Sequence, residues 1–523
     1  MKNAQWVKVE NSIKLTEKGR MVFRHAGKQI LLVAQEDKVF AVDNRCPHEG
    51  YPLSEGSLSS DCTLTCNWHN WKFDLQSGDT VVGGDMLRHY PVRRDGEGLW
   101  LDIQDAPAEA IQQKALDNIQ ASFQRYEYAR MARELTRLKQ AGGHYEQAVV
   151  DCIKRNYDRF EYGMGHAFGA AADWLSYGAE LEKTGREDAA LVPVLEVISH
   201  IAWDVLREKS FPFTTDSLPY DRDSFLLAIE QEDEHLAVAL VRGALRQGMT
   251  YDDLEPDLAT AAYAHYNDFG HSVIYVYKTG QLIARLGAEV LEPLLLSLIR
   301  NLIYASREDL IPEFKYYGTA LAKWDSKGSQ PVKASDFREL PIKKAMDRMV
   351  LSSANVKALF AAIHETLAWN ILYFDLSRDQ STDHPIARNV SWLSLTHGLT
   401  FANASRELCG RYPELWPQAL LQMACFSGRN AAYTDGGQDV SRWSVNDPAA
   451  FFVLEFDQLL DHGFPEPIIS CHRVKVLSAV QEDTALLAYA PIMLASANRY
   501  LNSPIKRKHS LRIAKQARQF VLA

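Results

Sequence analysis

Two short motifs contain the residues of this chain that are best suited to binding a metal: Cys46-Pro47-His48 and Cys66-Asn67-Trp68-His69. Together they offer two thiolates and two imidazoles, a ligand set that suits iron. A structural zinc site with the same ligand types is the alternative. In zinc fingers the two cysteines usually form one pair and the two histidines another. Here each motif supplies one of each, which favours an iron centre bound from both loops.

The residues around these motifs have a pattern typical of β-structure. The apolar runs at 30–34 and 39–42 are short, and Glu36-Asp37 lies between them as a turn. This hairpin leads the chain into Cys46, and glycines recur as turn formers through the same region. We therefore expect an all-β domain over residues 1–106.

The loops CPHEGYPLSEG and CNWHNWKFD resemble those of a Rieske ferredoxin domain, and the resemblance covers about the first fifth of the chain. It implies a Rieske [2Fe–2S] cluster, with Cys46 and Cys66 on one iron and His48 and His69 on the other. It also implies electron transfer through the imidazole side.

The same loops predict a low reduction potential. High-potential Rieske proteins carry an extra cysteine in each loop, joined by a disulfide, and a serine after the last histidine. Here Tyr51 and Trp68 hold the cysteine places, and Asn70 and Trp71 follow His69. Fewer hydrogen bonds to the sulfurs leave the reduced cluster less stabilised, which lowers its potential.

Length and composition restrict the remaining possibilities. A chain of 523 residues with 46% hydrophobic content is expected to form two or more domains. The net charge of −10 argues against nucleic-acid binding. No apolar run is long enough for a membrane span, and the N-terminus lacks a secretory pattern. The seven cysteines form no disulfide framework, so a cytoplasmic location is expected.

Helical spacing of apolar residues replaces the β pattern after position 106. We expect a helical linker over 107–142 and a large α-helical domain over 143–523. The predicted fold class is therefore multi-domain, with an all-β domain followed by a mostly helical one.

Histidines on the predicted helices are the candidates for a second site. Glu232-x-x-His235 and Asp268-x-x-His271 each pair a carboxylate with an imidazole one turn apart. His265 is expected to flank Asp268 on one continuous helix over 257–278. A single pair of this kind more often has a structural role on the surface or in the core. The number of histidines on apolar helices favours a metal or substrate pocket.

Three further histidines lie in apolar helical segments: His364, His397 and His166. A lone histidine on such a face is usually a hydrogen-bonded core residue. We take His235, His265, His271, His364 and His397 as the candidate catalytic residues, and a second non-haem iron site as the chemistry they would provide.

The helical region does not match the iron-binding partner domain of the Rieske oxygenases. That family carries Asp-x-x-His-x-x-x-x-His in its iron-binding partner domain. Asp268 and His271 begin the pattern, but Val276 stands where its second histidine belongs. The partner domain of that family is also built around a sheet, whereas this region is predicted to be helical.

The helical region is similar instead to the family named after questin oxidase. The similarity lies in YDRFEYGMGHAFGAAADWLSYGA, AAYAHYNDFGHSVIYVYKTGQLIARLG and LTHGLTFANASRELCGRYPELWPQALLQMACFSGRN. It implies Baeyer–Villiger-like oxidation of polyketide-type aromatic compounds.

No flavin or NAD fingerprint is found. Gly163-x-Gly165-x-x-x-Gly169 does not follow a strand, so close helix packing explains it better than nucleotide binding. Electrons are therefore expected to come from a separate reductase. The basic C-terminal segment 506–518 is expected to be a solvated helix, with docking to an anionic partner as the alternative.

These features predict an oxidoreductase in which a Rieske cluster relays electrons to a helical domain that oxidises an organic substrate with O₂. Two alternatives remain. The helical domain could dock a separate oxygenase, or it could be an interaction domain switched by the redox state of the cluster.

Overall fold

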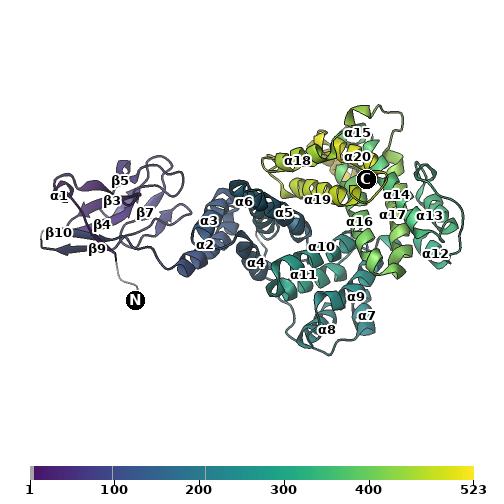
Figure 1. Ribbon diagram of the computed structural model, residues 1–523, viewed down its shortest axis with the longest axis horizontal. Coiled ribbons are helices and arrows are strands. Elements are labelled where there is room, and N and C mark those ends of the chain that lie inside the picture. The colour runs from purple at the N-terminus through teal and green to yellow at the C-terminus, as the bar shows by residue number, and fades with distance from the viewer. Residues whose placement is uncertain (1–4, 97, 207, 523) are drawn as a thin grey trace. The chain divides into compact units, whose positions relative to one another are not determined.

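The computed structural model describes residues 5–96, 98–206 and 208–522. The chain divides into two compact units, Met1–His144 and Tyr145–Ala523. The first contains small antiparallel sheets and the second consists of helices (Figure 1). The predicted fold class is confirmed.

Three small antiparallel sheets form the N-terminal unit, with strand orders β1-β10-β9, β2-β3-β4 and β5-β6-β7-β8. One short helix, α1 (Ile13–Lys18), lies among them. The strands are β1 (Trp6–Lys8), β2 (Arg20–His25), β3 (Lys28–Gln35), β4 (Lys38–Asp43), β5 (Ser57–Leu58), β6 (Thr63–Thr65), β7 (Lys72–Asp74), β8 (Thr80–Val82), β9 (Val92–Asp95) and β10 (Gly98–Asp102).

Strand β3 separates two apolar cores. Ile30 and Leu32 face one core and Leu31 and Val33 face the other, because successive side chains of a strand point to opposite sides. The second core also contains Cys46 and Cys66. The two cysteines are thus anchored in the hydrophobic interior of the unit.

Two helices complete this unit: α2 (Ala108–Ser122) and α3 (Tyr128–Gln140). The buried carboxylate of Asp85 accepts ion pairs from Arg130, Arg133 and Arg137 of α3, at 3.3, 2.7 and 3.4 Å. A buried carboxylate needs such partners, so this network fixes α3 to the loop after β8.

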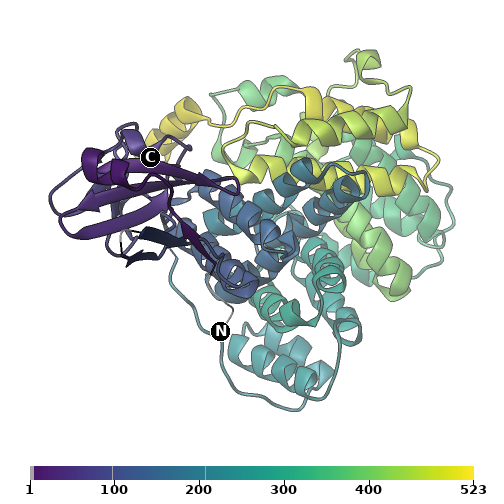
Figure 2. The ribbon, with the colours of Figure 1, turned by 60° about the vertical axis from the view of Figure 1, so that its left-hand side comes forward.

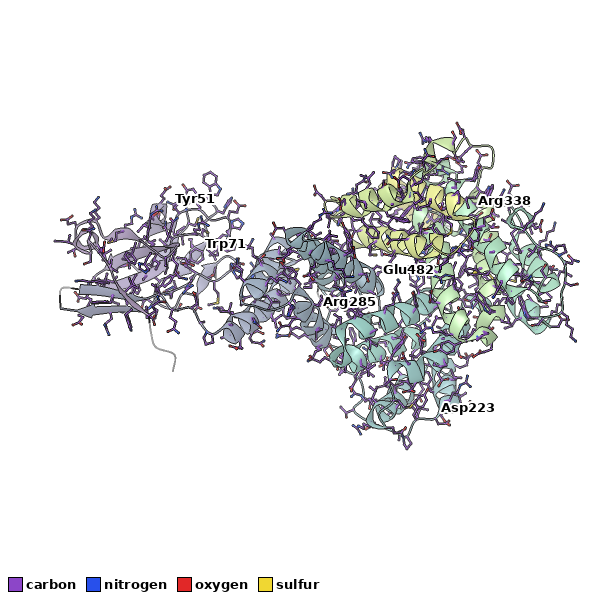
Figure 3. The ribbon with its side chains drawn as sticks, in the orientation of Figure 1. Tyr51, Trp71, Asp223, Arg285, Arg338 and Glu482 are labelled. Atoms are coloured by element: carbon purple, nitrogen blue, oxygen red, sulfur yellow. The ribbon has the colours of Figure 1, made fainter. Side chains whose placement is uncertain are left out.

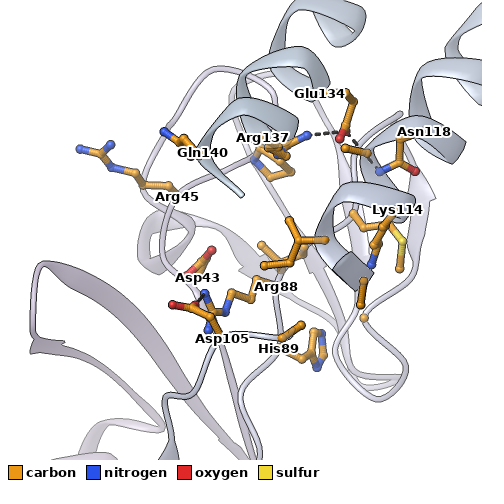
Figure 4. Close-up of a pocket in the computed structure, with 18 of the residues that line it drawn as sticks. Asp43, Arg45, Arg88, His89, Asp105, Lys114, Asn118, Glu134, Arg137 and Gln140 are labelled. Atoms are coloured by element: carbon orange, nitrogen blue, oxygen red, sulfur yellow. Dashed lines mark hydrogen bonds and ion pairs between the residues drawn. The ribbon is translucent and has the colours of Figure 1, made fainter. Parts of the chain in front are cut away.

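A cavity of about 1220 Å³ lies between these helices and the sheets. Its wall includes Cys46, so it borders the first ligand loop. Charges of both signs line it: Glu134 accepts from Asn118 at 3.3 Å and pairs with Arg137, while Arg88 pairs with Asp105 at 2.5 Å (Figure 4). Because these charges are paired with each other, we do not assign the cavity a ligand.

The C-terminal unit is helical throughout, apart from one isolated β-bridge between Phe374 and Thr434 within the part of the chain described. No helix among the described residues is both long and apolar enough to cross a membrane. Its α-helices are α4 (Tyr145–Asn156), α5 (His166–Lys183), α6 (Glu187–Asp204), α7 (Arg222–Glu230), α8 (Glu234–Arg246), α9 (Tyr251–Ala264), α10 (His271–Leu286), α11 (Leu291–Ile303), α12 (Tyr317–Ala322), α13 (Ile342–Leu351), α14 (Val356–Leu372), α15 (Leu376–Gln380), α16 (Trp392–Arg411), α17 (Trp416–Asn430), α18 (Pro448–Leu459), α19 (Pro467–Thr484), α20 (Ala490–Asn502) and α21 (Ser510–Leu522).

Four of these helices form a closed ring: α5 packs on α10, α10 on α16, α16 on α19, and α19 on α5. They come from distant parts of the sequence, as their blue, teal, green and yellow colours show (Figures 1 and 2). Gly169 permits the first contact, since a Cβ there would lie 2.5 Å from the Tyr275 ring. Asn403 of α16 donates to Glu482 of α19 at 2.9 Å (Figure 3 labels Glu482).

The prediction of one continuous helix over residues 257–278 is wrong. Helix α9 ends at Ala264 and α10 begins at His271. Between them, four consecutive residues have positive φ: Asn267 (53°), Asp268 (50°), Phe269 (61°) and Gly270 (83°). Such a left-handed turn costs energy for residues with a Cβ, so other contacts must hold it in place.

Candidate metal centres

The two motif loops of the N-terminal unit have the same backbone geometry. In each, the cysteine N–H donates to the carbonyl five residues on at 2.8 Å, and the N–H four residues on donates back, at 2.8 and 2.9 Å. That fourth residue is left-handed in both loops: Gly50 has φ 78° and Asn70 has φ 59°. Glycine and asparagine tolerate this conformation best.

The two histidines of the motifs lie together, and so do the two cysteines. His48 Nδ1 and His69 Nδ1 lie 3.2 Å apart, so both can bind one iron. Cys46 and Cys66 are buried behind them. Burial raises the pKa of the Cys46 thiol to about 11, although the backbone N–H groups of His48 and Glu49 act in the opposite direction. Without metal the thiol is therefore protonated at neutral pH.

Aromatic rings join the two loops. Tyr51 stacks on Trp68, with ring centroids 5.2 Å apart, and Trp71 stacks on His48 at 4.7 Å. Figure 3 labels Tyr51 and Trp71. All seven cysteines are free thiols. Stacking of Tyr51 on Trp68 thus links the loops at the places where high-potential Rieske proteins have a disulfide.

A second cluster lies in the helical unit, where the ring of helices supplies one histidine each. His166 and His271 are the first residues of α5 and α10, and His397 and His472 lie inside α16 and α19. One ligand nitrogen from each lies within 4.8 Å of all the others. Around the cycle His166–His271–His397–His472, neighbouring ring centroids are 4.4 to 4.9 Å apart.

Backbone carbonyls orient two of these rings. His271 Nδ1 donates to the Asn267 carbonyl at 2.9 Å, and His472 Nδ1 donates to the Ile468 carbonyl at 2.7 Å. A neutral imidazole with its proton on Nδ1 has a lone pair on Nε2. Metal-binding histidines are oriented in this way in general.

The Nε2 atoms face one another. His271 Nε2 lies 3.0 Å from His166 Nε2, and His472 Nε2 lies 3.1 Å from His397 Nε2. Such a pair of nitrogens shares a proton in one tautomer, and with both lone pairs directed inward it binds a cation. Two nitrogens bound to one metal at about 2.1 Å would be roughly 3.4 Å apart in tetrahedral geometry. The four histidines therefore fit a single metal ion, and imidazole suits iron, copper, nickel or zinc.

Electrostatics keeps these imidazoles neutral, as metal ligation requires. Burial lowers the pKa of His271 to about 4. Burial, and then the neighbouring histidines, lower the pKa of His166 and His397 well below its usual value. For His472, burial and then the charge of Lys475 act in the same direction.

The segment after α11 holds the left-handed turn that presents His271. The N–H of Asp268 donates to Ser306 Oγ at 3.0 Å, and the N–H of Phe269 donates to both carboxylate oxygens of Glu308, at 3.1 and 3.2 Å. Burial raises the pKa of Glu308 to about 7. Since no helix satisfies these N–H groups, Ser306 and Glu308 replace the missing helical carbonyls.

Two of the five histidines selected as catalytic candidates, His271 and His397, belong to this cluster. The other three lie elsewhere. His265 pairs with Glu230 at 3.1 Å, and His364 contacts Tyr489 at 3.0 Å and Asp483 at 3.5 Å. His235 is exposed and pairs with Asp216 at 3.0 Å. These partners give each a structural explanation.

His166 and His472 complete the cluster but were outside the selected set. His166 lies in the segment YGMGHAFGAAADWLSYG and is the first residue of its helix. His472 has two basic neighbours, Arg473 and Lys475, and such residues are typical of a solvated helix face. Burial of Lys475, at 1% exposure, shows that this face is interior.

Comparisons with known proteins bear on the N-terminal unit. The family model described as "Rieske [2Fe-2S] domain" matches residues 5–90. The ferredoxin component of the alkene monooxygenase system of Xanthobacter autotrophicus is 30% identical over 89 residues, which are 17% of this chain and 73% of that protein. The chain belongs to the Rieske [2Fe–2S] family through this region. The Rieske domain thus implies a [2Fe–2S] cluster and iron–sulfur electron transfer.

Other similar proteins also match only part of this chain. The 4beta-methylsterol monooxygenase of Methylococcus capsulatus is 31% identical over 113 residues, but the chain covers only 30% of its length. The 3-phenylpropionate/cinnamic acid dioxygenase ferredoxin subunit of Escherichia coli K12 is 33% identical over 69 residues, 13% of this chain and 65% of that protein. The solved structure of the ferredoxin of carbazole 1,9a-dioxygenase from Nocardioides aromaticivorans IC177 is 23% identical to this chain. The match covers 19% of this chain and 100% of that structure, with a TM-score of 0.18.

Proposed function

We propose that the chain is an oxygenase-type oxidoreductase. Its Rieske domain supplies electrons singly, and the four-histidine cluster is the site at which a small organic substrate is oxidised. The observation that supports this most directly is the convergence of four neutral imidazoles in the interior of a chain that also carries a Rieske domain. A non-haem iron bound there would supply the chemistry of O₂ activation.

The residues have separate roles in this proposal. Cys46, Cys66, His48 and His69 bind the [2Fe–2S] cluster. His48 and His69 are the partly exposed pair, which suits exchange of electrons with a separate reductase. That partner is inferred because the relatives named as ferredoxin components and subunits belong to monooxygenase and dioxygenase systems.

In the helical unit, His166, His271, His397 and His472 would hold the metal. The carbonyls of Asn267 and Ile468 keep the protons of His271 and His472 on Nδ1, away from the metal side. A Baeyer–Villiger-like oxidation of an aromatic compound, implied by the resemblance to questin oxidase, is the reaction we assign to this site.

Metal analysis of anaerobically purified protein tests the proposal. We expect about three irons per chain, two in the cluster and one in the helical unit, together with a Rieske EPR signal after dithionite reduction. Cys46→Ala should remove the EPR signal and leave the helical iron. His472→Ala should do the reverse, whereas His364→Ala, a buried control outside the cluster, should keep both. About two irons and no other metal would refute the proposal and favour a docking or redox-sensing role.

A further inference from the structure

Lys475 is a buried lysine beside the four-histidine cluster. It lies one turn after His472 on α19, is 1% exposed, and has no hydrogen-bond partner for its Nζ among the described residues. Its Nζ lies 6.0 Å from the centroid of the Tyr275 ring, and that ring is 5.5 Å from the ring of His271. The charge of Lys475 acts on all four histidines of the cluster.

Burial lowers the pKa of Lys475, and Cys471 and Asp173 act in the opposite direction without a hydrogen bond to its Nζ. Asp173 is buried nearby, but its Oδ1 is 2.7 Å from Nζ of Lys278, which is also buried. One carboxylate therefore serves two lysines, and only Lys278 is bonded to it. The four histidines bring no negative charge, because each is neutral as a ligand. A divalent metal would add two further positive charges to this region.

An isolated buried ammonium is costly, so a protein retains one where it has a counter-ion or a task. We propose that the four-histidine site binds an anion, held by Lys475 on the side of the cluster that faces Tyr275. This anion is the class of ligand that the site of the proposed function would bind, and its role in catalysis rests on that function. Either a small inorganic anion or the anionic group of the organic substrate provides the required chemistry, and Lys475 is the positioning residue.

Thermal unfolding and calorimetry of the full-length protein test this, with azide as the inorganic probe and benzoate as the organic one. In the wild type, an anion that binds the native state should raise the melting temperature, and the rise should grow with the logarithm of its concentration above Kd. Lys475→Met should weaken binding by tenfold or more, and Lys475→Arg should stay within about threefold of the wild type, since the charge is kept.

A second measurement needs no ligand. Lys475→Met removes a buried amine that no hydrogen bond satisfies, so it should raise the melting temperature of the anion-free protein. Lys278→Met is the matched control: it leaves Asp173 without its partner and should lower the melting temperature. Loss of stability in Lys475→Met with unchanged anion affinity would overturn the inference and show a structural role.

The outcomes separate this inference from the proposed function. Metal in the helical unit with equal azide and benzoate affinity in wild type and Lys475→Met overturns the anion site alone. Absence of metal with Lys475-dependent anion binding overturns the proposed function and keeps the anion site. Competition of benzoate with azide would assign the site to an organic anion, and binding of azide alone would assign it to a small inorganic one.

Discussion

Replacing Gly270 with alanine should destabilise the helical unit by two separate effects. Gly270 lies immediately before His271 with φ 83°, and a residue with a Cβ pays about 1–2 kcal/mol in this left-handed region. A Cβ there would also lie 2.3 Å from Cδ2 of the Phe401 ring. Phe401 is fully buried, with the rings of Tyr263 and Phe426 at 6.2 and 5.2 Å, so it has little room to move.

Overpacking of this kind costs about 1–3 kcal/mol, which gives a total loss of about 2–5 kcal/mol for Gly270→Ala. Gly248→Ala is the matched control. Gly248 has the same φ of 83°, but a Cβ there would meet nothing within 4 Å. The control should lose only the backbone contribution, about 1–2 kcal/mol.

Denaturant unfolding followed by far-UV circular dichroism measures both variants in the full-length protein. We expect Gly270→Ala to be less stable than Gly248→Ala by about 1–3 kcal/mol. Because Gly270 sets the entry of the chain into α10, the same variant should also lower the metal content of the four-histidine cluster, whereas the control should not. Equal stability of the two variants would show that Phe401 yields, and the packing argument would then be wrong.

Three further predictions concern other groups. Burial raises the pKa of Glu308 from 4.5 to about 7, so the native state holds this proton more tightly than the unfolded chain. The free energy of unfolding should fall by up to roughly 3 kcal/mol as the pH rises from 4.5 through 7, and Glu308→Gln should remove this fall in denaturant titrations at pH 5 and 7.5. His265→Ala takes away one of two partners of Glu230, the other being Arg307. It should lower stability without changing the metal content found by elemental analysis. Redox titration of the Rieske cluster should give a potential near the low end of its class, about −150 mV, and a strongly positive value would contradict the reasoning from its loops.

The Rieske region could be predicted from sequence because its chemistry is local. Each ligand loop places a cysteine and a histidine within four positions, and the turn residues Gly50 and Asn70 are recognisable. The alternation along β3, which anchors Cys46 and Cys66 in one core, follows from the period of a strand.

The four-histidine cluster could be predicted only in part. Its members are spread from His166 to His472, and nothing in the spacing of residues shows that four helices close into a ring. The break before His271 was recognisable in principle, since Asn267, Asp268 and Gly270 tolerate left-handed backbone. Phe269 does not share that tolerance, and the carboxylate of Glu308 that holds it lies 39 residues further along the chain.

The groups that orient the histidines explain why no motif marks this site. His271 and His472 are each held by the carbonyl four residues earlier, a group that every residue type provides. A carboxylate in that role would appear in the sequence as a pair such as Glu-x-x-His, which is the pattern that directed attention to His235. A main-chain carbonyl leaves no such trace. Burial gives the more informative clue: Lys475, one turn from His472, is only 1% exposed. A lysine is unusual in such an interior position and becomes intelligible once the pair faces a common ligand.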